Sequence, residues 1–218
     1  MGAVEPSKSR KEFCETHNLD ASRTIVTLLP GSRAGELNHH MPVLQAGCVL
    51  INGKVPAQFV LAAAHAQDIQ QLKEGWPTGL AIRVVEGQTY DALAAANAAI
   101  VSSGTATVEA ALLNVPMVVI YRVSPLTATL AKPLVRTPYF AMVNLIAEKR
   151  VVPELMQDDF TPERVAAETM NLLQEPNVRE TQRRGMEEVR KRLGPPGAVE
   201  RAADEIAEML QVTSGNAF

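Results

Sequence analysis

Short apolar runs alternate with longer segments of helical periodicity between Thr24 and Tyr121. The first run, Thr24–Leu29, ends at a Pro-Gly pair and precedes Glu36–Asn52, whose apolar side chains recur every three or four residues. Strands alternating with helices are typical of a parallel sheet covered on both faces, so we expect an α/β fold, a Rossmann-like doubly wound parallel sheet with C-terminal helices. Further strands are predicted at Gln58–Ala62, Leu80–Val85, Ala98–Val101 and Met117–Tyr121, with helices around Ala66–Lys73, Tyr90–Ala96 and Thr105–Leu113.

The pattern changes after Tyr121, and strands are no longer predicted. A mostly apolar helix is expected at Ser124–Val135, followed by a loop-rich passage over residues 144–154. The chain is therefore expected to divide into three segments: a linker with a leading helix at 1–22, one Rossmann-like domain at 23–211, and a flexible tail at 212–218. The remaining helices are predicted at Ser7–His17, Pro162–Gln174 (capped by Thr161), Asn177–Leu193 and Ala198–Leu210.

Composition narrows the class of protein. The net charge is −3 and no Lys/Arg-rich run is present, which argues against nucleic acid as a main partner. No apolar run reaches the roughly 18 residues of a membrane-spanning helix, so a soluble protein is expected. Cys14 and Cys48 lack metal-ligand spacing, which favours reduced thiols in a cytoplasmic protein. His39 and His40 are expected as a surface pair, because neighbours in a helix do not share a face.

The stretch from Ala98 to Tyr121 contains the strongest candidate site. Ser102–Thr105 separates a buried strand from an alanine-rich helix, and a loop at a helix N-terminus offers backbone N–H groups to a phosphate. Glu109 lies about one turn into the helix on the face of Thr105, where it suits the hydroxyls of a ribose. The alternative is an ordinary helix cap with a surface glutamate.

A second candidate is the turn Pro30–Arg33 (PGSR), where the first strand ends. Glycine permits close approach of the backbone to a ligand, and the planar guanidinium of Arg33 can bind a phosphate. The alternative is a plain strand-to-helix turn with a solvated arginine. Asn144 and Glu154 belong to a loop expected near the same sheet edge, and each is also a common turn or capping residue.

Three segments resemble the C-terminal half of lipid-A-disaccharide synthase, an inverting glycosyltransferase of the two-domain GT-B type: LLPGSRAGEL (28–37), SSGTATVEAALLNVPMVVIYR (102–122) and NLIAEKRVVPELMQ (144–157). The resemblance implies that diacylglucosamine passes from UDP-2,3-diacylglucosamine to lipid X, forming lipid A disaccharide 1-phosphate and releasing UDP. Members of this family are nearly twice as long. The acceptor site and the catalytic base are therefore expected in an N-terminal domain outside this chain.

The resemblance also implies which residues bind the donor. Ser32 and Arg33 of the PGSR turn would lie near the diphosphate, and Gly104 and Thr105 of the second loop would lie beside it. Glu109 would bind the ribose, while Asn144 and Glu154 would close the donor pocket. The resemblance implies no cofactor and no metal.

Alternatives to this function stay open. A UDP-N-acetylglucosamine 2-epimerase-like enzyme would share the fold but needs acid and base groups that cannot be placed here. A non-catalytic UDP-binding module is the other alternative. An apolar segment with nearby basic residues suggests either peripheral contact with the inner membrane or burial against another domain or a second subunit, as in a homodimer. Its members are Leu126, Leu130, Lys132, Leu134, Arg136, Phe140 and Met142.

Overall fold

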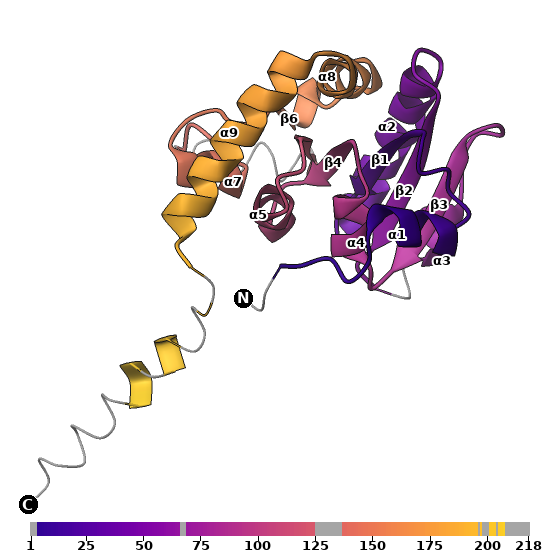
Figure 1. Cartoon of the computed structure of the whole chain (residues 1–218). Helices are drawn as coiled ribbons and strands as arrows, with labels where there is room; N and C mark the ends of the chain where they lie inside the picture. The colour runs from indigo at the N-terminus through magenta and orange to yellow at the C-terminus, as the bar shows by residue number, and fades with distance from the viewer. Residues whose placement is uncertain are drawn as a thin grey trace, which may run out of the picture.

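A six-stranded, fully parallel sheet forms the centre of the computed structural model, which describes residues 4–65, 69–124, 137–195, 197, 201–203 and 205–207. The strand order is β3-β2-β1-β4-β5-β6, so the direction of progression reverses between β1 and β4 (Figure 1). This topology confirms the predicted Rossmann-like fold. The strands are β1 (Thr24–Leu29), β2 (Ala57–Ala63), β3 (Ala81–Glu86), β4 (Ala98–Ser102), β5 (Met117–Tyr121) and β6 (Glu154–Met156).

Helices cover both faces of the sheet and enclose two hydrophobic layers. One layer receives side chains from α1 (Arg10–Thr16), α4 (Thr89–Ala94), α5 (Thr105–Leu112), α7 (Met142–Ala147) and α9 (Pro176–Leu193). The other receives them from α2 (Ala34–Asn52), α3 (Ile69–Lys73) and α8 (Pro162–Gln174). A short 3-10 helix, η2 (Gln157–Asp159), joins β6 to α8. Each layer contains one fully buried cysteine, Cys14 in the first and Cys48 in the second.

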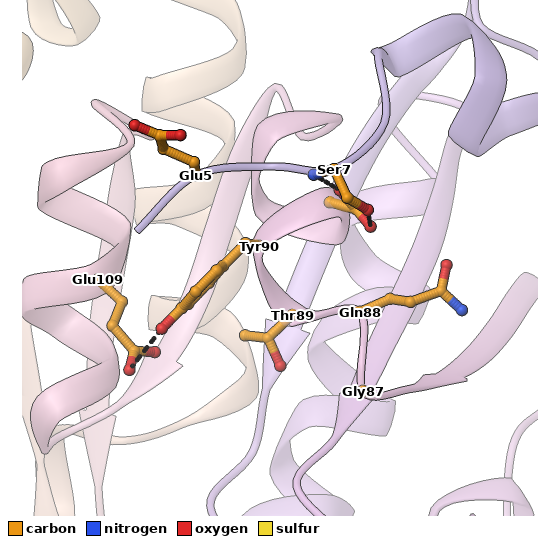
Figure 2. Close-up of a pocket in the computed structure, with 8 residues that line it drawn as sticks. Glu5, Ser7, Gly87, Gln88, Thr89, Tyr90 and Glu109 are labelled. Atoms are coloured by element: carbon orange, nitrogen blue, oxygen red, sulfur yellow. Dashed lines mark hydrogen bonds between the residues drawn. The ribbon is translucent and has the colours of Figure 1, made fainter. Parts of the chain in front are cut away.

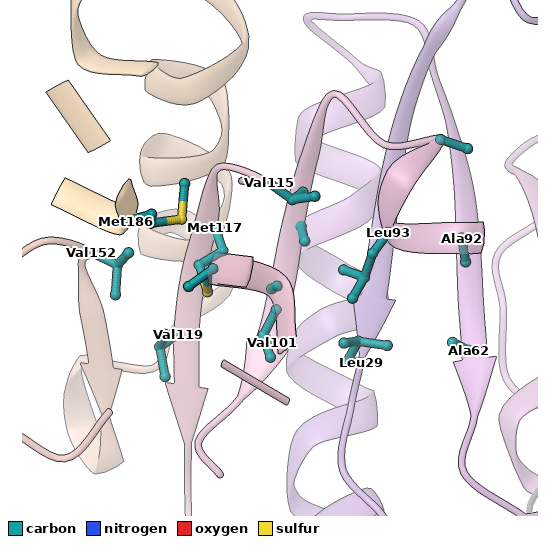
Figure 3. Close-up of a cluster of buried hydrophobic side chains, with 14 of the residues drawn as sticks. Leu29, Ala62, Ala92, Leu93, Val101, Val115, Met117, Val119, Val152 and Met186 are labelled. Carbon is teal, nitrogen blue, oxygen red and sulfur yellow. The ribbon is translucent and has the colours of Figure 1, made fainter. Parts of the chain in front are cut away.

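The central strands show why the sheet was predictable. In β4, Ala99 and Val101 point into the first layer, while Ala98 and Ile100 point into the second. Figure 3 shows Val101 in the first layer beside side chains of the neighbouring strands. Because both faces are buried, the strand reads as a continuous apolar run, and each fully buried large side chain contributes about 1.5–3 kcal/mol.

The passage over residues 144–154 differs from its prediction as loops. It contains the C-terminal part of α7 and the start of β6, which pairs with β5 at the sheet edge. These two elements have six and three residues, too few for a periodic pattern to stand out.

The N-terminal segment expected as a linker packs onto the sheet. Ser9 caps α1 with a capping box to Glu12, and Phe13 is fully buried in the first layer. Upstream, the backbone N–H and hydroxyl of Ser7 both donate to Asp91 of α4, at 2.6 and 2.8 Å. The predicted leading helix is therefore confirmed, and it covers one end of the sheet beside α4 (Figure 1).

Several predictions lie largely or wholly outside the described residues. These are the helices at Ser124–Val135 and Ala198–Leu210 and the tail at 212–218. The domain boundaries stay a prediction. Among the described residues, no helix combines the length and the apolar character needed to cross a membrane.

Candidate nucleotide site at the sheet edge

A cavity of about 470 Å³ opens at the carboxyl ends of β1, β2 and β4. It lies where the strand order reverses, the place at which open α/β sheets bind ligands. The turn after β1 and the loop after β4 form two of its walls, and Met142 of α7 borders it. Its volume is in the range of small-molecule sites.

The turn after β1 is held by Glu36, a residue that the sequence did not single out. One carboxylate oxygen, Oε2, accepts from the Ser32 backbone N–H at 3.2 Å, and Oε1 lies 3.0 Å from Nη1 of Arg33. Gly31 has a φ of +117°, and a Cβ there would lie 2.3 Å from Glu36 Oε2. Only glycine fits this position, because any side chain would be strained and would displace the carboxylate.

Arg33 presents its charge to solvent at the cavity wall. Its side chain is 80% exposed, whereas that of Glu36 is 11% exposed. An ion pair this exposed contributes little to stability, so the guanidinium can exchange its carboxylate partner for a phosphate at small cost. A signal for Glu36 does exist in the sequence: it is the acidic residue in the first turn of the helix that Arg33 precedes.

The loop after β4 presents backbone rather than charged side chains. Gly104 is the N-cap residue of α5, and the helix has no side-chain cap, so its first N–H groups lack the partner that a cap would supply. The Ser103 hydroxyl donates to the Phe140 carbonyl at 3.0 Å, and the Thr107 hydroxyl donates to the Gly104 carbonyl at 2.7 Å. The Ser102 hydroxyl is buried without a hydrogen-bond partner in the described part of the chain. This wall can therefore donate to an anion.

Glu109 lies further along α5, between this cavity and a second one of about 350 Å³. Figure 2 shows Tyr90 reaching from the start of α4 toward Glu109, with its hydroxyl 3.5 Å from Oε1. The carboxylate is half-buried, and burial raises its pKa above the ordinary value while the Tyr90 hydroxyl partly opposes this. Glu109 can accept hydrogen bonds from ligand hydroxyls, and Thr89 borders both cavities beside it.

Asn144 and Glu154 do not line the cavity. The Asn144 side-chain oxygen accepts from the backbone N–H groups of Val151 and Val152, at 2.8 and 3.0 Å. Its amide nitrogen donates to the Val152 carbonyl and to Glu154 Oε1. Glu154 also accepts from the backbone N–H groups of Phe140 and Ala141. The pair thus holds the backbone before α7, behind the cavity wall.

The structure therefore brings five of the seven predicted residues to one cavity: Ser32, Arg33, Gly104, Thr105 and Glu109. Of the apolar segment, Phe140 and Met142 are exposed, and its other members lie outside the described residues. Within the described ranges, no group of three His, Cys, Asp or Glu side chains could hold a metal ion.

The prediction of a surface histidine pair is wrong for His40, which is fully buried, while His39 is partly exposed. His40 lies three residues after Leu37 and four before Leu44, on the buried face of α2. That spacing could have identified it.

Comparisons with known proteins agree with this geometry. The family model of lipid-A-disaccharide synthetase matches residues 1–208. Lipid-A-disaccharide synthase of Syntrophus aciditrophicus is 41% identical over 208 residues, covering 93% of this chain and 54% of the relative. The enzyme of Solibacter usitatus is 42% identical over 211 residues, covering 96% of this chain and 55% of that protein. The chain thus spans about half the length of the curated relatives it matches.

Several solved structures that share this fold are glycosyltransferases. WaaG, a glycosyltransferase involved in lipopolysaccharide biosynthesis, gives a TM-score of 0.58 at 12% identity, covering 93% of this chain and 52% of WaaG. The spinosyn rhamnosyltransferase SpnG, complexed with thymidine diphosphate, gives 0.54 at 15% identity, covering 78% and 42%. These likenesses establish a glycosyltransferase fold of the GT-B type, and the family match goes further. The chain belongs to the lipid-A-disaccharide synthetase family.

Proposed function

We propose that this chain is the nucleotide-sugar-binding half of a lipid-A-disaccharide synthase, and that the cavity at the β1–β4 edge holds the UDP-2,3-diacylglucosamine donor. One observation carries the proposal: Arg33, the uncapped N-terminus of α5 and Glu109 line a single cavity at the point where the strand order reverses. A cation and helix N–H groups suit a diphosphate, and a carboxylate suits ribose hydroxyls.

In the proposed reaction, the 6-hydroxyl of lipid X attacks the anomeric carbon of the donor sugar from the side opposite UDP. A carbon–oxygen bond to the acceptor forms while the bond to the β-phosphate breaks, and the hydroxyl proton passes to a base outside this chain. Arg33 and the α5 N-terminus stabilise the negative charge that develops on UDP. Inversion at the anomeric carbon follows from this single displacement.

Two findings support the choice of ligand. The relatives of about 40% identity are named lipid-A-disaccharide synthases, and SpnG, which shares the fold, was solved with a nucleoside diphosphate. In this proposal, the acceptor site and the catalytic base lie in the half of the relatives' length that this chain does not match.

Calorimetric titration of the 218-residue chain with UDP and with uridine tests the binding step. We expect UDP to bind, and uridine to bind more weakly because it lacks both phosphates. Incubation with UDP-2,3-diacylglucosamine and lipid X should yield no disaccharide. Absence of UDP binding, or turnover by this chain alone, would contradict the assignment of a donor-binding half.

The proposal extends to the membrane, where diacylated substrates reside. Phe140, Met142 and Leu145 are exposed around the start of α7, and Met142 borders the cavity. We propose that this edge rests on anionic lipid, with burial against another domain or a homodimer as the alternative. Flotation with anionic vesicles at low salt checks this: a chain that stays unbound favours the protein interface.

A further inference from the structure

His40 connects two strand ends through both of its ring nitrogens. Nδ1 lies 2.7 Å from the Pro30 carbonyl oxygen, and Nε2 lies 2.9 Å from the Arg122 backbone nitrogen. A carbonyl only accepts and a backbone N–H only donates, so Nδ1 carries the proton, and Nε2 is unprotonated and accepts. The partners thus assign a neutral imidazole in the Nδ1–H form.

The two bonded groups follow different strands of the sheet, β1 and β5. Pro30 begins the PGSR turn, which carries Ser32 and Arg33 to the cavity wall. Arg122 directly follows β5, and its guanidinium donates to the Gln157 and Phe160 carbonyls. The imidazole therefore links the turn to a part of the fold that is itself well anchored.

Aromatic side chains pack against the buried His40 ring. The ring is fully buried, and it meets Phe160 edge-on with centroids 5.4 Å apart at an interplanar angle of 86°. Tyr121 lies on another side, with a centroid separation of 6.0 Å. Arg122 in turn stacks over Phe160. A ring packed in this way is a rigid spacer.

We propose that His40 is a positioning residue for phosphate binding: its Nδ1–H holds the PGSR turn through the Pro30 carbonyl, so that Ser32 and Arg33 face the N-terminus of α5 across the cavity. The Arg122 N–H, bound to Nε2, selects the ring form that keeps the proton on Nδ1. This inference rests on the proposed donor site. It adds a residue that lies outside the cavity lining and acts only through the Pro30 carbonyl.

A consequence is a dependence on pH. Burial lowers the pKa of His40 below its ordinary 6.5, so the ring is neutral at pH 7. The charged or titratable groups around it are Glu36 and His39 on α2, Tyr121 at the end of β5 and Arg122 directly after it; Phe160, which meets the ring edge-on, is uncharged. Protonation places a second donor against the Arg122 N–H and breaks that bond. The contribution of the neutral ring to stability is therefore complete above about pH 6.5 and is lost as the pH falls below it.

Two amide variants separate the two bonds. In His40→Asn the amide nitrogen can take the place of Nδ1 and keep the bond to Pro30. In His40→Gln the amide oxygen can take the place of Nε2 and keep only the bond to Arg122. We expect His40→Gln to weaken UDP about tenfold and His40→Asn less than threefold, with uridine affinity equal in the two variants. Equal UDP affinities in the variants, or an equal loss for uridine, would overturn the proposal.

The pH profile supplies a readout that loss of packing would not change. The UDP phosphate itself titrates near pH 6, so His40→Asn serves as the reference. Protonation breaks only the Arg122 bond, which His40→Asn already lacks, so between pH 7.5 and about 5.5 native protein should lose more unfolding free energy than the variant while UDP affinity follows the same profile in both. A steeper fall of UDP affinity in native protein would contradict a role that acts through the Pro30 bond.

Nitrogen NMR of the native protein keeps the test open if the variants do not fold. At pH 7 the His40 ring should show the Nδ1–H pattern, and its signals should shift when UDP saturates the chain. An Nε2–H pattern, or no shift while Arg33 signals move, contradicts the proposal. If native protein binds no UDP, the proposed function is wrong, and the effect of His40 on the PGSR turn is tested without ligand. The backbone NMR signals of Gly31–Arg33 should then shift in His40→Gln and stay unchanged in His40→Asn.

Discussion

Two polar clusters, one in the cavity wall and one around Asn144 and Glu154, differ in how much hydrogen-bonding capacity the fold leaves unused. In the cavity wall, Arg33 is mostly exposed and α5 begins without a side-chain cap. In the cluster behind it, the side-chain oxygen and nitrogen of Asn144 are both bonded, and Glu154 accepts three N–H donors. Unused capacity indicates ligand binding, whereas complete satisfaction indicates structure.

The comparison predicts two kinds of mutant. Changes in the cavity wall should alter affinity and leave stability nearly intact, and changes in the Asn144 cluster should do the reverse. Gly31 belongs to both kinds, because it shapes the wall and also adjoins the Glu36 carboxylate.

Gly31→Ala should therefore have the largest effect. The left-handed φ of +117° and the close approach to Glu36 predict a loss of about 2–3 kcal/mol in unfolding free energy. UDP affinity should fall more than tenfold. The control is Gly35→Ala: its Cβ meets nothing within 4 Å in α2, so stability should hold or rise slightly. Denaturant titration and calorimetry measure both quantities, and equal behaviour of the two variants would count against the strained turn.

Asn144→Ala should destabilise the fold by about 2–3 kcal/mol, because it leaves the partly buried N–H of Val151 and the buried N–H of Val152 without acceptors. UDP affinity of the folded fraction should change less than twofold. Asn171→Ala, at an exposed position of α8, is the matched control and should stay within about 0.5 kcal/mol. A specific loss of UDP affinity in Asn144→Ala would return Asn144 to the donor site.

Arg33→Ala should reverse that pattern. Charge-assisted hydrogen bonds contribute roughly 1.5–3 kcal/mol, so UDP affinity should fall about tenfold or more while uridine affinity and stability stay unchanged. Arg184→Ala removes a similarly exposed arginine, paired with Glu180 on α9, and should change neither affinity. If UDP and uridine weaken together, Arg33 does not contact phosphate.

Glu109→Gln should give the smallest effect, visible mainly in its pH dependence. Burial raises the Glu109 pKa above that of the unfolded chain, so native stability is lost as the pH rises from about 4.5 through the folded pKa. The variant should therefore compare more favourably with native protein at pH 7 than at pH 4 in urea titrations. It should also reduce the preference for UDP over 2′-deoxy-UDP. An unchanged preference removes Glu109 from the ribose.

The strands of the central sheet could be predicted because burial on both faces leaves a continuous apolar run, as in β4. The three residues of β6 give no such signal, since that strand is defined by its pairing with β5. The same limit applies to the site. The sequence identifies Arg33 by its position after the first strand and Glu109 by its position within the helix that follows the Ser102–Thr105 loop. Glu154 looks equally suitable, and only its tertiary bonds show that its carboxylate is already occupied.

His40 illustrates the opposite error. A pair of adjacent histidines suggests a polar surface, yet one ring lies on the apolar face of α2 and is satisfied by two backbone groups distant in sequence. Sequence spacing reveals the face on which a side chain lies. The backbone groups that satisfy the buried ring nitrogens directly follow β1 and β5, and no local pattern in the sequence specifies them.

The two buried cysteines give the molecule a pair of built-in reporters of local opening. Cys14 lies on one face of the sheet and Cys48 on the other, and burial raises the pKa of both thiols, so neither reacts while its layer stays closed. The rate at which a thiol reagent modifies each cysteine then measures how often that face opens. Glu36 of α2 lines the cavity, and Cys48 lies on the same helix. A bound ligand that stabilises α2 should therefore lower the rate at which the reagent modifies Cys48.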